Sequence, residues 1–272
     1  MERSIFIIGA SSKLSQSIRE IYSEDKICDV YRDTYTSWIG ENSQNIIQTF
    51  FENRISNNSI IFITAAILNP KTPFQEVFDM NYNLPVNIIE SLTEYNPRIV
   101  TLGTILEKLG PSNNNYVSSK IKLSTKIESL IKKNLRITHF RLHTLYGKGY
   151  PNEFMFLGQI FYAIKNKTDF HMSSGEQIRE YHHYDDVVSS INTFLDNETS
   201  GIVEITFGNG MAIKDLAIKI FDFFEKSELL KIGSKNLDFK EKFQNDYKKN
   251  EDIKIDFKEP ISGITKYLKT II

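Results

Sequence analysis

The chain has few of the features that would place it outside the cell, in a membrane or on nucleic acid. Its single cysteine, Cys28, cannot form a disulfide within the chain, which fits a reducing compartment. No apolar run is long enough to span a bilayer, and the run after Met-Glu-Arg is too short for a signal peptide. The 33 basic and 34 acidic residues leave a formal charge of −1, so no overall field attracts nucleic acid or an anionic membrane. We therefore expect a soluble, cytoplasmic protein that binds neither.

Metal ligands are also scarce. His182 and His183 are adjacent, but we find no cysteine or carboxylate at metal-ligand spacing from them, so we expect no metal site. What the chain does have is 272 residues, 40% of them hydrophobic and 25% charged, enough for one compact unit or for one unit with a lobe.

Glycine is scarce where a phosphate-binding turn would need it. The apolar run Ser4-Ile-Phe-Ile-Ile8 ends at Gly9-Ala-Ser-Ser-Lys-Leu-Ser15, and Leu14, Ile18 and Ile21 then follow at helical spacing. This pattern predicts a strand, a tight turn and a helix, whose backbone amides suit a pyrophosphate. Of the three glycines usual in such a turn only Gly9 is present, with Ser12 and Ser15 at the other positions. We expect the cofactor contacts of this turn to come from Gly9, Ser11, Ser12, Lys13 and Leu14.

Three residues can form one proton-transfer site. Tyr116 and Lys120 stand four residues apart, which on a helix places phenol and ammonium one turn apart on the same face. There the cation favours ionisation of the phenol, so we expect a lowered Tyr116 pKa. Thr104 ends an apolar strand just upstream and can bind the same substrate oxygen. Taken alone, the Tyr-Lys spacing is more typical of an ordinary solvated pair on an amphipathic helix, and the segments around it reverse that preference.

Four further segments follow in an order that resembles the short-chain dehydrogenase/reductase superfamily, specifically its extended subgroup of nucleotide-sugar epimerases, dehydratases and reductases. They are Ile60 to Ala66, Asn81 to Glu90, Phe140 to Gly147, and Gly175 to Asp186. The resemblance covers most of the chain. It implies an α/β fold with a Rossmann-type, doubly wound parallel sheet and a smaller carboxyl-terminal lobe that binds substrate.

The resemblance also assigns roles to residues. It implies that Ile60 to Thr64 is the family's fourth strand, leading into a turn beneath the adenosine ribose, and that Phe140 begins the sixth. It gives Asn81 the role of supporting the active site. It implies that Arg179 binds the substrate diphosphate, although an exposed salt bridge to Glu180 is an alternative. The remaining residues implied are Thr64, Ala65 and Ala66 at the cofactor and His143 and Thr144 at the sugar, where His143 can equally be structural.

We expect residues 1–146 to form the cofactor-binding domain, with the chain returning to it at about 184–206, and residues 147–272 to form mainly the substrate lobe. The predicted strands are 4–8, 27–31, 59–64, 98–102 and 136–142. The predicted helices are 14–22, 43–53, 85–95, 116–133, 154–164, 184–195 and 213–224.

The choice of cofactor depends on the end of the second predicted strand, Asp29-Val-Tyr-Arg-Asp33. An arginine there pairs with the extra phosphate of NADP, whereas an acidic residue binds the ribose hydroxyls of NAD. Placing Arg32 at the tip favours NADP, and Asp33 keeps NAD possible.

Comparison with the enzymes of the family that the chain resembles reduces the number of activities to be considered. Their 4,6-dehydratases carry an Asp-Glu pair directly after the threonine, where this chain has Ile105 and Leu106. Enzymes of the family that both epimerise and reduce use a cysteine and a histidine in the pocket, and Cys28 is predicted to lie on the far side of the domain, which argues against that double role. Tyr116 follows Thr104 by only 12 positions, an interval similar to that of nucleotide-sugar 4-ketoreductases such as CDP-paratose synthase.

We therefore predict NADPH-dependent reduction of a nucleotide-linked 4-keto-6-deoxyhexose, as in the biosynthesis of deoxysugars and surface polysaccharides. A nucleotide-sugar 4-epimerase with tightly held NAD(P), and a non-catalytic NADP-binding sensor or scaffold, remain the alternatives. The resemblance also implies a possible homodimer formed through the helix that bears Tyr116.

Overall fold

The structure is a computed structural model that describes residues 4–110, 112–236 and 248–272. It divides into two compact units. Unit 1 comprises Met1–Leu142 and Ile191–Glu204, and unit 2 comprises His143–Ser190 and Ile205–Ile272. Among the described residues, no helix combines the length and the apolar character needed to cross a membrane.

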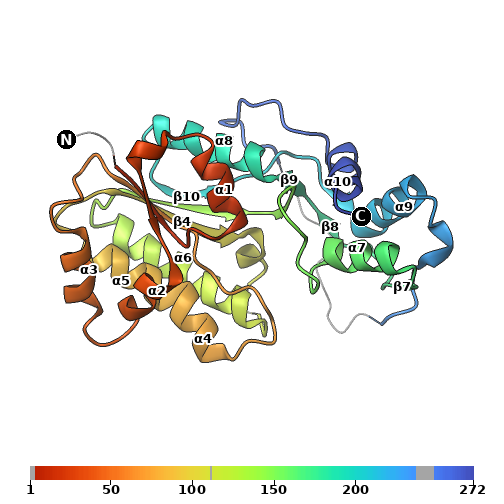
Figure 1. The fold of residues 1–272 in the computed structure, drawn as a ribbon, viewed down its shortest axis with the longest axis horizontal. Coiled ribbons are helices and arrows are strands. Elements are labelled where there is room, and N and C mark those ends of the chain that lie inside the picture. Colours follow the sequence, from red (N-terminus) through yellow and green to blue (C-terminus); the bar gives the residue numbers. More distant parts are fainter. Residues whose placement is uncertain (1–3, 111, 237–247) are drawn as a thin grey trace. The chain divides into compact units, whose positions relative to one another are not determined.

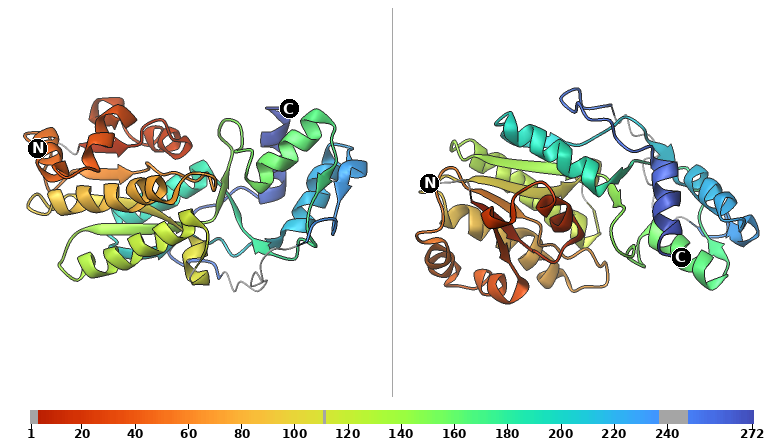
Figure 2. Two further views of the ribbon diagram at one scale, coloured as in Figure 1. Left: turned by 90° about the horizontal axis from the view of Figure 1, so that it is seen from below. Right: turned by 45° about the horizontal axis from the view of Figure 1, so that its top comes forward.

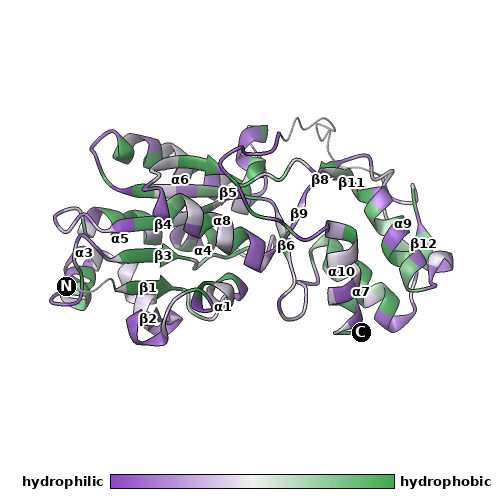
Figure 3. Cartoon of the chain, turned by 90° about the horizontal axis from the view of Figure 1, so that it is seen from above, coloured by the Kyte–Doolittle hydropathy of each residue, from purple (hydrophilic) through white to green (hydrophobic). Residues whose placement is uncertain are grey.

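Unit 1 is built on a six-stranded sheet in the order β10-β5-β4-β3-β1-β2, in which every neighbouring pair is parallel (Figure 1). The central strands are apolar on both faces, as Figure 3 shows by their colour, because helices cover both sides of a parallel sheet. This confirms the predicted α/β, Rossmann-type fold. The strands are β1 (Ile5–Ile8), β2 (Ile27–Val30), β3 (Ile60–Ile63), β4 (Arg98–Thr104), β5 (Ile137–Leu142) and β10 (Gly201–Glu204).

Helices cover this sheet in two layers (Figures 1 and 2). One layer packs its apolar residues, such as Phe51, Ile88 and Ile127, on the sheet residues Phe6 and Ile61. It contains α3 (Ser43–Phe51), α4 (Phe74–Phe78), the π-helical turn η3 (Asp79–Asn83), α5 (Leu84–Ser91) and α6 (Asn115–Ile131). The other layer contains α1 (Lys13–Arg19) and the end of α8 (Tyr184–Asp196).

The strand at Ile60, which resembles the family's fourth strand, is the third strand of this chain, and the strand containing Phe140, which resembles the family's sixth, is the fifth, in the order of the predicted strands. In the described chain, the segment between β2 and β3 forms helices only, so β2 is the edge of the sheet. The short helices of unit 1 are η1 (Glu24–Lys26), α2 (Arg32–Tyr35), η2 (Thr36–Trp38) and η4 (Ile105–Leu109).

Unit 2 has its own apolar core, in which Leu157, Phe161, Phe170, Leu216 and Phe221 are buried together. Its strands pair two by two, as β6 with β9, β7 with β12, and β8 with β11. Its helices are α7 (Phe156–Asn166), α9 (Ile213–Phe223), η5 (Ser227–Leu229) and α10 (Pro260–Lys269). Its strands are β6 (Thr144–Tyr146), β7 (Phe170–His171), β8 (Ile178–Arg179), β9 (Tyr181–His183), β11 (Met211–Ala212) and β12 (Leu230–Lys231).

Candidate active site

Thr104 lies where β4 ends and the 3₁₀ helix η4 begins. Its side-chain oxygen accepts a hydrogen bond from the amide of Leu106 at 3.3 Å, and its own amide donates to Oε1 of Glu107 at 2.8 Å. The Thr104 side chain also accepts from the Glu107 backbone, which together with the Glu107 side-chain contact forms a capping box that fixes the backbone at the carboxyl end of the strand. In parallel α/β sheets, this is the end at which ligands bind.

Tyr116 and Lys120 lie in the first two turns of α6. Asn114 caps this helix by accepting from the amides of Tyr116 at 2.9 Å and Val117 at 3.2 Å, so the position of Tyr116 is set by the helix start. The Nζ atom of Lys120 lies 5.9 Å from the centroid of the Tyr116 ring. The spacing thus produces the expected pair one turn apart, and the cation lies over the ring face.

The pKa of Tyr116 differs from the expectation. Burial raises it well above the usual range for a phenol, and the negative charge of Glu107 raises it further. The predicted lowering is therefore wrong for the protein alone, because burial of the phenol and the charge of Glu107 outweigh the effect of the Lys120 ammonium, whose own pKa burial lowers to about 8. Tyr116 is then a neutral phenol near pH 7, which is the form that donates a proton.

The turn after β1 shows how a chain can lack two of the three expected glycines. Gly9 has φ +98°, and a Cβ on it would lie 2.5 Å from the amide nitrogen of Ala65. Ser12 caps α1 by accepting from the Ser15 amide at 3.1 Å. The Ser15 hydroxyl is buried and bonds to the carbonyl of Gly9 at 3.0 Å and to the hydroxyl of Thr64 at 2.9 Å. Both serine hydroxyls are thus engaged within the protein.

The other residues of this turn differ in exposure. Ser11 is exposed, Leu14 is buried, and burial lowers the pKa of Lys13. The amides in the first turn of α1 have no acceptor within the helix, apart from the one that Ser12 caps. The turn therefore retains backbone donors that can bind a phosphate.

Thr64 and Asn81 connect this turn and α6 to the end of β3. The Thr64 hydroxyl bonds to the carbonyls of Ile8 and Gly9, both at 3.0 Å. The Asn81 amide group pairs with the backbone of Ile67 at 2.8 and 2.9 Å and donates to Ser119, on α6, at 3.1 Å. Asn81 lies in the π-helical turn η3, and such turns are frequent at functional sites. Ala65 is buried and Ala66 partly buried beside them.

The end of β2 presents both candidate determinants of cofactor choice. Arg32 begins α2, and both it and Asp33 are exposed. Asp29, on β2, is instead paired with Arg19 at 2.8 Å. Both Arg32 and Asp33 are thus accessible at the tip of the strand.

His143, Thr144 and Arg179 belong to unit 2. The Thr144 amide donates to the backbone carbonyl of Glu180 at 3.3 Å, and the Arg179 guanidinium donates to the carbonyl of Ile178 at 2.8 Å. The Glu180 carboxylate is 1% exposed, so an exposed Arg179–Glu180 salt bridge is wrong.

The Glu180 carboxylate has buried donors instead. It accepts from His182 at 2.7 Å and from the amides of Phe207 and Gly208 at 2.9 Å. His143 Nε2 lies 3.9 Å from the same carboxylate. Within the described residues, no group of three or more His, Cys, Asp or Glu side chains is arranged to hold a metal ion.

Sequence reasoning missed one group of unit 1. Glu107 is buried three residues after Thr104, and it contacts Arg141 at 2.9 Å and His139 at 3.3 Å, both on β5. The spacing Thr-x-x-Glu is the signature of a capping box and could have identified the Thr104–Glu107 contact. The contacts from β5 had no such local signal.

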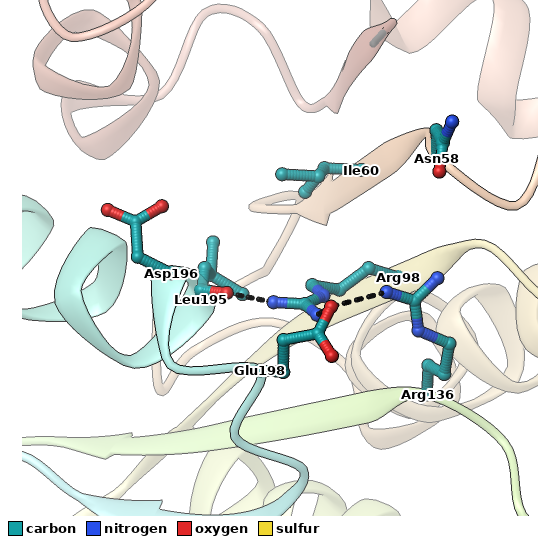
Figure 4. Close-up of a pocket in the computed structure, with 7 residues that line it drawn as sticks. All are labelled: Asn58, Ile60, Arg98, Arg136, Leu195, Asp196 and Glu198. Carbon is teal, nitrogen blue, oxygen red and sulfur yellow. Dashed lines mark hydrogen bonds and ion pairs between the residues drawn. The ribbon is translucent and has the colours of Figure 1, made fainter.

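A cavity of about 290 Å³ lies at the end of the sheet where β4 begins, opposite to the end that carries Thr104 (Figure 4). Arg98, at the start of β4, lines it, whereas Thr104 ends the same strand. Glu198 lies 3.2 Å from Arg98 and 3.5 Å from Arg136, and Arg98 also donates to the carbonyl of Leu195. Asp196, which also lines the cavity, accepts from Asn192 at 3.0 Å, and we regard these contacts as structural.

Together, these observations describe a Rossmann-type α/β unit in which Thr104 ends β4 and the Tyr116–Lys120 pair lies at the start of α6. The model of the NAD dependent epimerase/dehydratase family matches residues 43–206. The chain belongs to this family. A comparison with curated protein sequences found no match.

Solved structures with the same fold span the whole chain. A UDP-N-acetylglucosamine 4-epimerase from Methanobrevibacter ruminantium M1, in complex with UDP-N-acetylmuramic acid, has a TM-score of 0.78 and 12% identity over 99% of this chain and 98% of that one. A dTDP-4-dehydrorhamnose reductase from Bacillus anthracis str. Ames, in complex with NADP, has a TM-score of 0.76 and 16% identity over 99% and 100%. A dTDP-glucose 4,6-dehydratase from the same organism, in complex with NAD, has a TM-score of 0.74 and 14% identity over 98% and 96%.

Proposed function

We propose that this protein reduces the keto group of a nucleotide-activated 4-keto-6-deoxyhexose with NADPH. The observation that carries the proposal is the Thr104, Tyr116 and Lys120 arrangement, in which Tyr116 is held as a neutral phenol beside a buried ammonium. A reductase needs a proton donor for the alkoxide that forms at the keto carbon, and a neutral phenol is one.

The residues of unit 1 suit a dinucleotide. The tight turn at Gly9 brings β1 against Ala65, and backbone amides at the start of α1 can donate to a pyrophosphate. Arg32 is exposed after β2, where its guanidinium can pair with a 2′-phosphate, which supports NADP over NAD. When bound, the nicotinamide supplies the hydride.

In the proposed mechanism, the Thr104 hydroxyl holds the substrate oxygen at the end of β4. Tyr116 donates its proton to that oxygen as negative charge develops there. Lys120 supplies positive charge beside the ring of Tyr116 and so limits the cost of forming the phenolate. Proton transfer of this kind typically contributes about 100- to 10,000-fold to the rate.

Two observations support simple reduction over related activities. Ile105 and Leu106 follow Thr104 in η4, so this turn offers no acidic pair for moving protons at two sugar carbons. Cys28 lies on the edge strand β2, and burial raises the pKa of its thiol, which makes it a poor acid/base group near neutral pH. The resemblance to CDP-paratose synthase in the interval before Tyr116 supports a 4-ketoreductase.

Arg179, His143 and Thr144 are the proposed substrate ligands of unit 2. Arg179 has the planar guanidinium that pairs bidentately with a diphosphate. We propose accordingly that residues 147–272 serve mainly substrate binding and that residues 1–146 with about 184–206 serve cofactor binding.

The test is the consumption of NADPH or NADH by the purified protein with a panel of CDP-, dTDP-, GDP- and UDP-linked 4-keto-6-deoxyhexoses. We expect stoichiometric oxidation of NADPH with one of them. Interconversion of 4-hydroxy nucleotide sugars without net oxidation would make the protein a 4-epimerase. Cofactor binding without turnover of any sugar would make it a non-catalytic binder.

A further inference from the structure

The buried carboxylate of Glu107 contacts the backbone of the proposed catalytic residue Thr104. Glu107 is 7% exposed and stands in η4, three residues after Thr104. Its Oε1 accepts from the Thr104 amide at 2.8 Å, and its Oε2 accepts from Arg141 Nε at 2.9 Å. His139 Nε2 lies 3.3 Å from Oε2. Burial alone would raise the pKa of Glu107, but hydrogen bonds from His139 and Arg141 lower it overall, so the side chain is ionised.

The contacts of His139 show which way its hydrogens point. The imidazole is fully buried, and burial lowers its pKa, so it is neutral near pH 7. An ionised Glu107 can only accept, so His139 Nε2 carries the hydrogen. Its Nδ1 then accepts from the Thr101 hydroxyl at 2.8 Å.

Gly103 makes room for this network. A Cβ at Gly103 would lie 2.1 Å from Oε1 of Glu107 and 2.3 Å from Nε2 of His139. The residue before Thr104 therefore has no side chain where the carboxylate and the imidazole meet. The network is thus built into the end of β4.

The charge of the Glu107 carboxylate affects the pKa of both Tyr116 and Lys120. Its charge raises the pKa of Tyr116 and opposes the lowering of the pKa of Lys120 by burial. We propose that Glu107 is a positioning residue of the active site: it holds the backbone of Thr104 at the end of β4 and supplies the buried negative charge that balances the ammonium of Lys120. This inference rests on the proposed function of Thr104, Tyr116 and Lys120.

Other charged groups come from the elements that pack on α6. Besides Glu107, they are Glu76 on α4, Asp79 on η3, Lys108 on η4, Arg98 on β4, Glu204 on β10, and His139 and Arg141 on β5. Asp79 bonds to Gln75 and Asn83, and Glu204 pairs with Lys108 at 2.9 Å. Among all these charged groups, it is the Glu107 carboxylate that raises the pKa of Lys120.

Two substitutions separate the two roles of Glu107. Glu107→Gln removes the charge but keeps an oxygen that can accept from the Thr104 amide. Glu107→Asp keeps the charge but draws it back from Thr104 by one methylene. Glu204→Gln is the matched control, because Glu204 also lies near Arg141, at 3.6 Å, but is partly exposed.

The first readout needs no substrate. In protein labelled with ¹³Cε-lysine, the Lys120 resonance is identified by its loss in Lys120→Met and titrated by NMR. We expect the Lys120 midpoint to fall below about 8 in Glu107→Gln and to stay near about 8 in Glu107→Asp and Glu204→Gln. An unchanged midpoint in Glu107→Gln overturns the inference.

A second variant guards against the misfolding of Glu107→Gln. Arg141→Gln removes a positive charge from the same network, so the Lys120 midpoint should move upward, opposite to its shift in Glu107→Gln. A downward shift or none in Arg141→Gln would count against the inference. Far-ultraviolet circular dichroism establishes which variants fold.

The second readout is the pH profile of NADPH-dependent turnover. In Glu107→Gln, kcat at about pH 8 should fall roughly fivefold, as for a tenfold change in the proton affinity of Lys120, and recover toward the wild-type value at lower pH. Glu107→Asp should lose kcat equally at all pH values. A uniform loss in Glu107→Gln contradicts the charge role. If the wild type reduces no sugar, the proposed function fails, whereas the NMR titration still decides the role of Glu107.

Discussion

The hydroxyl oxygen of Ser15 lies 2.9 Å from that of Thr64, which stands 49 positions later in the chain. This contact joins the turn after β1 to the end of β3. A glycine at position 15, as in the usual phosphate-binding turn, would lack it. Where the usual glycine lets the backbone pack closely, Ser15 instead forms buried hydrogen bonds that stabilise the turn.

We predict that Ser15→Ala destabilises unit 1. The substitution leaves the Thr64 hydroxyl and the Gly9 carbonyl each without one buried partner, so the free energy of unfolding should fall by about 1–3 kcal/mol. Urea unfolding of the variant and the wild type measures this. Ser129→Ala, on the exposed face of α6, should change it little, and equal effects of the two substitutions would show that the Ser15 contacts add nothing.

Tyr116→Phe should abolish the proton donor while keeping the ring under Lys120. We expect kcat to fall about 100- to 10,000-fold with the affinity for NADPH nearly unchanged. Steady-state kinetics and cofactor fluorescence measure the two quantities. Tyr95→Phe, at a partly buried tyrosine that packs against the core of unit 1, is the control and should retain activity. Retained activity in Tyr116→Phe would remove this residue from the mechanism.

Arg32→Ala should weaken the binding of NADPH more than that of NADH. A charge-assisted contact to the 2′-phosphate is worth about 1.5–3 kcal/mol, or roughly 10- to 100-fold in affinity. Calorimetric titration with both cofactors measures the ratio. Arg54→Ala, at an arginine over the ring of Phe50, serves as the control for loss of a positive charge. Equal weakening of both cofactors, or loss of NADH binding in Asp33→Ala, would favour NAD.

The pH dependence of stability should reveal the buried Lys120. Its pKa is lowered to about 8 in the folded protein from an unfolded value of 10.5. Between these two values the unfolded chain binds more protons, so the contribution of Lys120 to stability rises with pH from about 8 upward and is constant below. The wild type should therefore gain stability relative to Lys120→Met as the pH rises from about 8 towards 10.5. A difference that is independent of pH would show that Lys120 is not desolvated.

Local patterns in the sequence predicted the elements that position the site. The run at Ile5–Ile8 and the helical spacing after Asn114 correspond to β1 and α6 within a residue or two. Such elements depend on residues that are close in the chain, and the spacing of their apolar residues indicates whether they form a strand or a helix.

Interactions between distant residues could not be predicted in this way. His139 and Arg141 reach Glu107 from 32 and 34 positions away. The pKa of Tyr116 was misjudged for the same reason, because its burial and the charge of Glu107 outweigh the one neighbour, Lys120, that the spacing revealed.

The most direct test of the central claim is the fate of the transferred hydrogen. The protein is incubated with NADPH deuterated at the transferable position and with the 4-keto sugar that supports its oxidation, and the product is examined by NMR. We predict deuterium on C4 of a 4-hydroxy sugar, in amounts equal to the NADPH consumed. A 4-hydroxy product without deuterium at C4, or oxidation of NADPH without such a product, would contradict reduction at this site.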